Sequence, residues 1–150
     1  DTPRPQRLLN LSSRTTITPS NPMLIGGFVV CAPGAKAGES RTVLIRAVGP
    51  SLASLGVPNP LAMPQLKIFD HAGNEDIQPA RPAVWLGYNA TTVAAKVGAF
   101  PLLPDAHDVA WLLAVTQGPY TVQVISGDGT SGDVLLEVYE VPAEFLRADS

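Results

Sequence analysis

The sequence predicts an all-β protein, an antiparallel β-sandwich of the immunoglobulin-like or jelly-roll-like kind, with about eight strands and one short helix near residues 91–97. Apolar and polar residues alternate on both sides of a loop in Gly118–Glu140, GPYTVQVISGDGTSGDVLLEVYE, which is typical of a β-hairpin. The 15 prolines and 13 glycines fall mostly between apolar runs and indicate short strands joined by stiff loops. Strands and helices do not alternate along the chain, and this argues against a parallel sheet.

Four strands are expected in the first half of the chain. They are Arg7–Ile17, Met23–Cys31, Arg41–Val48 and Gln65–Asp70. The paired glycines at 26 and 27 inside the second strand indicate a bulge or a close approach of another segment. Residues 49–64 hold four prolines and two glycines, so only a short turn is expected there.

The second half opens with a turn within His71–Asp76, through Gly73 and Asn74. A short strand is expected at Val84–Tyr88, and a helix of about two turns at Thr91–Val97. Asn89 or Thr91 would cap the start of that helix, and Gly98 would end it. Val109–Thr116 is expected to be a buried strand, and Pro142 ends the last strand of the hairpin.

We expect three regions: an N-terminal arm and edge strand at 1–17, a sandwich domain at 18–142, and a tail at 143–150. In Arg7–Ile17 the residues on one face are only half apolar. Such a face suits an edge strand better than a central one. The polar lead before it, DTPRPQ, would be extended.

Composition excludes two classes of partner. The net charge is −3, so the chain has no basic surface for nucleic acid. No run of apolar residues is long enough to span a membrane, so no membrane insertion is expected. The sequence begins at Asp1, so either a leader was removed or the chain was trimmed, and we expect a mature chain after signal removal. The single Cys31 is expected to be a small buried apolar residue.

Few residues have the spacing of a catalytic or metal site. Ser51 lies in GPSLA, which lacks the second glycine of a nucleophile elbow, and the histidines at 71 and 107 have no ligand-pair spacing. We therefore expect no enzyme, no catalytic residue and no resident cofactor. Calcium is the one ion that the sequence leaves open, through oxygen ligands in two turns. These ligands would be Asp70, Asn74 and Asp76 in one turn, and Asp128 and Asp133 in the other.

Arg46 stands among apolar residues of an expected buried strand. An unpaired buried charge is strongly unfavourable, so Arg46 needs acceptors or a carboxylate. A structural ion pair is favoured over a ligand-binding arginine.

Several stretches together resemble a known module. They are RLLNLSSR near the start, LIGGFVV at Leu24–Val30, VLIRAVGPSL at Val43–Leu52, AFPLLPDAHDVAWLLAV at Ala99–Val115, and GPYTVQV with GDVLLEVYE in the hairpin. In this order they resemble a module repeated in tandem in very large exported bacterial proteins, often cell-surface or adhesin-like. The final hairpin alone is similar to secreted β-sandwiches of the pre-peptidase C-terminal type. The resemblance implies an extracellular or cell-surface β module and no catalytic residues.

Two hypotheses of function follow. In the first, the chain is an extracellular structural subunit that joins copies of itself head to tail into a filament, by adding its N-terminal strand to a neighbour's sheet. Leu8, Leu9, Leu11 and Ile17 would form that subunit interface. In the alternative, the chain binds a surface polysaccharide or matrix component through the aromatic residues Trp85 and Tyr88.

Overall fold

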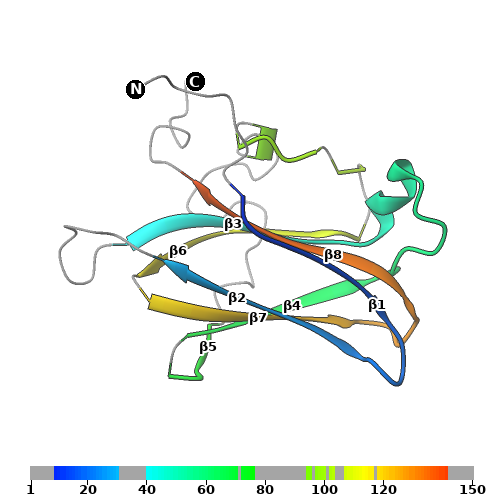
Figure 1. Cartoon of the computed structure of the whole chain (residues 1–150), viewed down its shortest axis with the longest axis horizontal. Helices are drawn as coiled ribbons and strands as arrows, with labels where there is room; N and C mark the ends of the chain where they lie inside the picture. The colour runs from blue at the N-terminus through cyan, green and yellow to red at the C-terminus, as the bar shows by residue number, and fades with distance from the viewer. Residues whose placement is uncertain are drawn as a thin grey trace.

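Two antiparallel four-stranded sheets pack face to face in this computed structural model, which describes residues 9–30, 40–70, 72–76, 94–95, 97–100, 102–103, 107–116 and 118–141 (Figure 1). The strand order is β1-β8-β3-β6 in the first sheet and β2-β7-β4-β5 in the second. The strands are β1 (Leu9–Ile17), β2 (Met23–Val30), β3 (Ser40–Val48), β4 (Pro64–Phe69), β5 (Glu75–Asp76), β6 (Val109–Thr116), β7 (Gly118–Ser126) and β8 (Gly132–Val141). The predicted all-β sandwich is confirmed.

Alternation along the strands places one row of each strand in the core. In β2 and β7 every second side chain is buried, as the period-two pattern predicts. The buried side chains that fill the space between the sheets include Leu24, Phe28, Val43, Ile45, Leu66, Ile68, Leu113, Val122, Val124, Leu136 and Val138.

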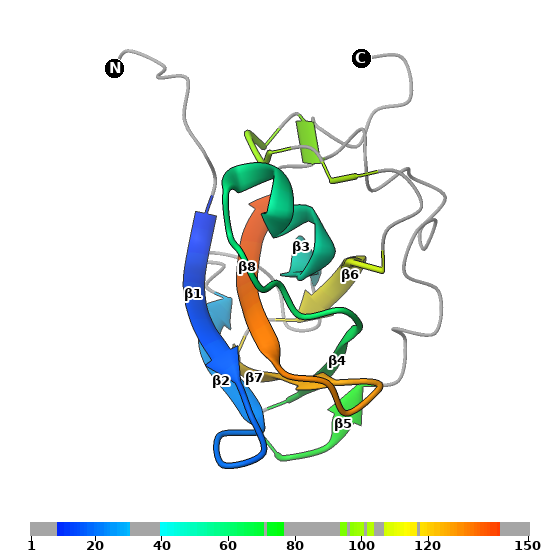
Figure 2. The same ribbon diagram turned by 90° about the vertical axis from the view of Figure 1, so that its right-hand side faces the viewer.

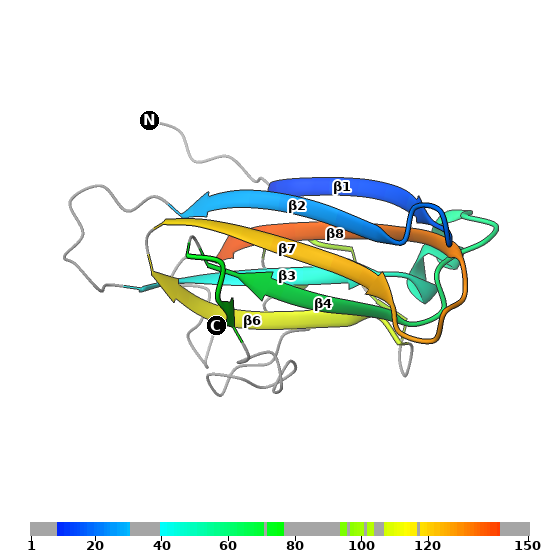
Figure 3. The same cartoon turned by 90° about the horizontal axis from the view of Figure 1, so that it is seen from below.

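The hairpin expected over Gly118–Glu140 is wrong in its pairing. Its two strands exist, but β7 pairs with β2 and β4, whereas β8 pairs with β1 and β3. The apolar face of each strand meets the other strand's sheet across the core, so the loop between Ser126 and Gly132 connects the two layers (Figure 3). Alternation alone does not distinguish edge-to-edge pairing from this face-to-face arrangement.

Five of the other expected strands are confirmed as β1, β2, β3, β4 and β6. The stretch after β3 contains a 3-10 helix, η1 (Pro50–Leu55), which begins at a proline and ends at Gly56 with a left-handed φ of 88°. The turn through Gly73 is confirmed, since Gly73 N–H donates to the Asp70 carbonyl at 3.0 Å.

The helix near 91–97 is described only at residues 94–95, which are helical. Its predicted end is confirmed: Gly98 has a φ of 85°, and the N–H of Ala99 donates to the Ala94 carbonyl at 2.9 Å. The expected strand at Val84–Tyr88, Cys31, the polar lead and the tail lie outside the described residues. Among those described, no helix has both the length and the apolar character needed to cross a membrane.

Residues around this helix end lie over the outer face of the first sheet (Figure 2). Val97 and Ala99 pack with Leu44, Leu112 and Tyr139 in one buried cluster. Phe100 and Leu102 pack against a second cluster, which contains Val48, Leu52 and Val57. These residues therefore form a second, smaller apolar layer on the outer face of the first sheet.

Leu61 is fully buried, and its backbone lies close to Gly49 on one side and to Gly132 on the other. Its N–H donates to the Asp133 carbonyl at 2.7 Å, and the N–H of Asp133 donates to the Asn59 carbonyl at 2.8 Å. A Cβ on Gly132 would lie 2.6 Å from the nitrogen of Leu61, and one on Gly49 would lie 2.2 Å from its carbonyl oxygen. Only glycine allows this close approach of three backbone segments.

Replacing Gly132 by alanine should destabilise the fold, because the new Cβ meets backbone atoms that cannot rotate away. We expect Gly132→Ala to lower the free energy of unfolding by roughly 1–3 kcal/mol in urea denaturation. Gly27→Ala, measured at a dilution at which the chain is monomeric, is the matched control, since its Cβ would meet only the Tyr120 carbonyl of the same chain at 3.7 Å. Equal stability of the two variants would contradict the role of Gly132.

Candidate functional site

Ser51 and Asp108 form the most chemically suggestive pair in the described part of the chain. The buried Ser51 Oγ donates to Asp108 Oδ2 at 2.5 Å and accepts from the Leu103 N–H at 2.7 Å. Asp108 Oδ1 also accepts from the N–H groups of Gly49 at 2.8 Å and Ser51 at 3.1 Å. Asp108 thus satisfies the free N–H groups at the start of η1. The arrangement holds η1 against the sheet and leaves the serine oxygen inaccessible to a substrate.

Arg46 and Glu137 form an ion pair at the centre of the outer face of the first sheet. They lie opposite each other on β3 and β8, and both are almost completely buried. Arg46 Nε lies 3.1 Å from Glu137 Oε1, and Arg46 Nη1 donates to the Phe100 carbonyl at 2.8 Å. The guanidinium lies 4.6 Å from the centre of the Phe100 ring. The predicted structural ion pair of Arg46 is confirmed.

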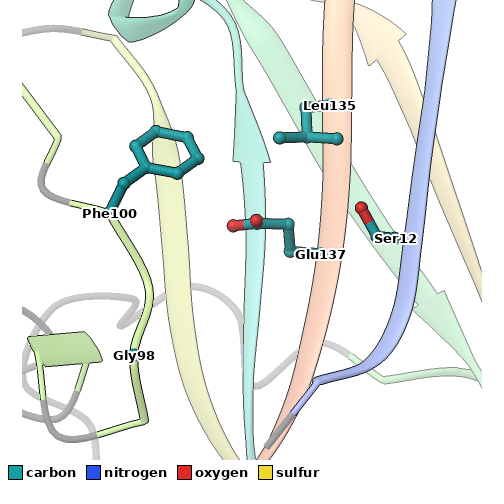
Figure 4. A pocket seen from close by; sticks show the side chains of 5 residues that line it. All are labelled: Ser12, Gly98, Phe100, Leu135 and Glu137. Atoms are coloured by element: carbon teal, nitrogen blue, oxygen red, sulfur yellow. The ribbon is translucent and has the colours of Figure 1, made fainter. Parts of the chain in front are cut away.

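A depression of about 420 Å³ lies beside this pair, lined by Ser12, Gly98, Phe100, Leu135 and Glu137 (Figure 4). Phe100 and Leu135 form apolar walls, and Ser12 contributes a hydroxyl from β1. Glu137 points toward β3 and away from Ser12 (Figure 4). The carboxylate of Glu137 is therefore directed at Arg46, and the lining of the depression contributes few polar groups for catalysis or binding.

Two of the carboxylates considered for calcium, those of Asp70 and Asp128, each close a local turn. Asp70 Oδ1 accepts from the N–H groups of Ala72 and Asn74, both at 2.9 Å. Asp128 Oδ1 accepts from the hydroxyl of Thr130 at 2.7 Å, and this contact, more than any other, lowers the pKa of Asp128. Among the described residues, no three His, Cys, Asp or Glu side chains gather as a metal site would require. The calcium expectation stays a prediction from sequence.

The side chain of Asp133 links its own strand, β8, to the edge strand β1. Its side chain accepts hydrogen bonds from Thr16 Oγ1 and from Arg14 Nη2, the latter at 3.2 Å, and both donors belong to β1. The hydrogen bond from the Thr16 hydroxyl is the largest influence and lowers the pKa of Asp133 below its usual 3.8. Burial opposes this shift, and the hydrogen bond and charge of Arg14 lower the pKa further. The ionised form is therefore favoured in the folded state.

The four residues expected at a subunit interface are placed as follows. Leu11 packs against the core and Ile17 is buried in it. Leu8 and the side chain of Leu9 lie outside the described parts. The prediction that this segment is an edge strand is confirmed, since β1 ends the first sheet.

The expectation that the backbone of this strand needs another copy is corrected. β1 pairs with β8 of its own chain from Leu9 to Ile17. A half-apolar face is sufficient for a strand in this position, because β1 lies at the edge of the sheet and directs only one row of side chains toward the core. Its other face, with Ser12, Arg14 and Thr16, is exposed.

The two aromatic residues expected to face a ligand, Trp85 and Tyr88, lie outside the described residues. Three other aromatic residues, Trp111, Tyr120 and Tyr139, are buried. The ring of Tyr120 stacks on Phe28 with centroids 5.5 Å apart. These three rings therefore serve packing.

Sequence reasoning missed the outer edge of β2. This strand ends the second sheet and pairs only with β7 among the described strands. Ile25 is 60% exposed and Val29 is 58% exposed, with the exposed Gly27 between them. The sequence MLIGGFVV has no charge and no proline over eight residues, and this was the available signal.

The direction of the β2 backbone groups follows from Pro119, which lies opposite Val29 on β7. Proline has no N–H, so Val29 and Pro119 form a pair without mutual hydrogen bonds. Hydrogen-bonded and non-hydrogen-bonded pairs alternate along an antiparallel ladder, so Ile25 and Gly27, like Val29, belong to non-hydrogen-bonded pairs with β7. The N–H and C=O groups of these three residues consequently point to the outer edge.

Asp133 should make the stability of the fold depend on pH in acid. Its folded pKa lies below the unfolded one, so the ionised side chain stabilises the fold above the unfolded pKa. That stabilisation is lost as the pH falls through the folded pKa. The difference in melting temperature between the wild type and Asp133→Asn should therefore shrink between about pH 7 and about pH 3. A difference that is constant over this range would contradict the assignment.

Comparison with known proteins gives one similarity of shape. No family model matches the chain, and no curated protein matches it. A solved structure that is similar is the 1.0 Å crystal structure of the pre-peptidase C-terminal domain of collagenase from Bacillus anthracis. Its TM-score is 0.48 at 13% identity, over 89% of this chain and 92% of that one. The resemblance to a tandem module stays a prediction from sequence.

Proposed function

We propose that this chain is a non-catalytic structural module that joins copies of itself by β-strand addition at the outer edge of β2. The observation that supports this is the exposure of an apolar, uncharged edge, in which Ile25 and Val29 are more than half exposed. An added strand would pair with the outward N–H and C=O groups of Ile25, Gly27 and Val29.

The edges of the two sheets differ in how strongly they invite pairing. Proteins usually protect an edge by making it short, by charging it or by interrupting it with proline. β5 has only two residues, and β1 has Arg14 and polar neighbours on its exposed face. β6, the other edge of the first sheet, is also uncharged, but its side chains from Trp111 to Leu113 are buried, so it exposes no comparable apolar surface. β2 has none of these devices over its eight residues. The proposal therefore places the joining surface at β2.

The head-to-tail filament built by the N-terminal strand requires a larger change. Giving β1 to a neighbour would break its pairing with β8 and remove Ile17 from the core. It would also separate Arg14 and Thr16 from Asp133. Addition at β2 needs no such rearrangement and is the form of self-assembly that we propose.

The remaining parts of the proposal rest on narrower grounds. The non-catalytic role is supported by Ser51 and Asp108, whose polar atoms bind each other and the start of η1. The extracellular or cell-surface location, in an exported protein, rests on the sequence resemblance. Polysaccharide binding through Trp85 and Tyr88 remains the alternative, and no observation in the described residues favours it.

A charge on the edge should prevent assembly. We expect the wild type to sediment with a mass that rises with concentration, and Ile25→Lys to stay at the 15.7 kDa monomer. Leu55→Lys is the matched control, because Leu55 is 56% exposed but lies on η1, away from the edge. Circular dichroism checks that both variants fold. A wild type that stays monomeric at high concentration, or equal effects of the two variants, would contradict the proposal.

A further inference from the structure

We propose that the strand added to β2 is β2 of a second copy, antiparallel to the first and centred on Gly27. Ile25 of each copy then lies opposite Val29 of the other. This inference rests on the proposed function and names the segment that occupies the edge. Figure 3 shows the edge, with β2 along one rim of the sandwich beside β1.

The geometry of the edge restricts the registers available to such a pair. Opposite residues in a sheet share a face, so the outward residues of one copy must meet outward residues of the other. In β2 the outward residues are Met23, Ile25, Gly27 and Val29. Ile25, Gly27 and Val29 also direct their N–H and C=O groups to the edge. A register centred on Gly27 therefore pairs all three residues with hydrogen-bonding partners.

This register also buries the exposed apolar surface best. With Gly27 opposite Gly27, the two branched side chains meet twice, once on each side of the centre. A register centred on Gly26 would instead set Ile25 opposite a glycine, and would leave its side chain without a cross-strand neighbour. Of these two registers, the pattern of exposure favours the one centred on Gly27.

The two glycines of β2 differ in what requires them. A Cβ on Gly26 would lie 2.8 Å from Leu11 Cδ2 and from Leu136 Cδ2, so a larger residue there would displace two leucine side chains of the same chain. A Cβ on Gly27 would meet only the Tyr120 carbonyl at 3.7 Å, which is ordinary contact. Gly27 has no positive φ either. A second backbone lying directly across the edge gives Gly27 a packing role that its own chain does not.

Charge and size set the expected strength of the pair. β2 has no charged residue, and Thr121 and Gln123 lie beside Gly27 and Ile25 on β7, so no like charges meet at the seam. Stable interfaces bury roughly 1,200–2,000 Å² in total, and two short strands fall at the low end. The dimer should therefore depend on concentration and should close on itself, because the same surface is used twice.

The test uses cysteine pairs in a Cys31→Ser background, which removes the single native thiol. Opposite residues in a hydrogen-bonded pair have Cα atoms about 5.5 Å apart, within the range that a disulfide spans. Gly27→Cys alone should form a disulfide-linked dimer on oxidation. Ile25→Cys mixed with Val29→Cys should link about half of the pairs, the statistical share of mixed dimers. Either variant alone should not link, because its thiols lie roughly 13 Å apart along the strands.

Lys67→Cys is the control and should not link, since Lys67 is exposed on the same sheet but lies on β4, which is separated from the β2 edge by β7. Linking of Ile25→Cys to itself, or a ladder of larger species, would overturn the antiparallel dimer. If Ile25→Lys still abolished assembly in that case, the proposed function would stand. No linking by any variant, together with a monomeric wild type, would overturn both.

Discussion

Backbone hydrogen bonding is the constraint on which this structure depends, and β2 is the described edge strand that has exposed, large apolar side chains beside its unpaired backbone groups. The strands β8, β3 and β7 have a neighbouring strand on both sides, whereas β4 has a second neighbour only at Ile68 and Phe69. β2 satisfies one side through β7, while Ile25, Gly27 and Val29 present theirs outward. Water can meet these groups, but the apolar side chains around them favour another strand.

The outer faces of the two sheets differ in how far the described residues cover them. On the first sheet, Val97, Ala99 and Phe100 pack over β3, β6 and β8, and the Arg46–Glu137 pair is sealed beneath them. A buried pair of this kind tolerates little change, since removing one partner typically costs about 3–5 kcal/mol. On the second sheet, Ile25 and Val29 remain exposed. Among the described residues, the outer face of the first sheet is thus covered, and the second sheet has the exposed apolar side chains at which we propose that a partner binds.

The sequence predicted the parts of this fold that depend on local pattern. Alternation located β7 and β8, and the isolated charge of Arg46 predicted its ion pair. Alternation could not predict that β7 and β8 belong to different sheets, because a strand with one apolar face can pair at its edge or pack across a core. The half-apolar face of β1 suggested a need for another copy, but its contacts with Asp133 and the core are long-range. The uncharged run of β2 suggested only burial, because exposure depends on which strand ends the sheet.

Residue-resolved amide hydrogen exchange along β2 tests the central claim most directly, at low and high protein concentration. The amides of Gly26 and Phe28 face β7 and should be protected at both concentrations. Those of Ile25, Gly27 and Val29 should exchange fast in dilute solution and become protected as the concentration rises. If these three amides exchange equally fast at every concentration while the rest of β2 stays protected, no strand joins this edge, and the account is contradicted.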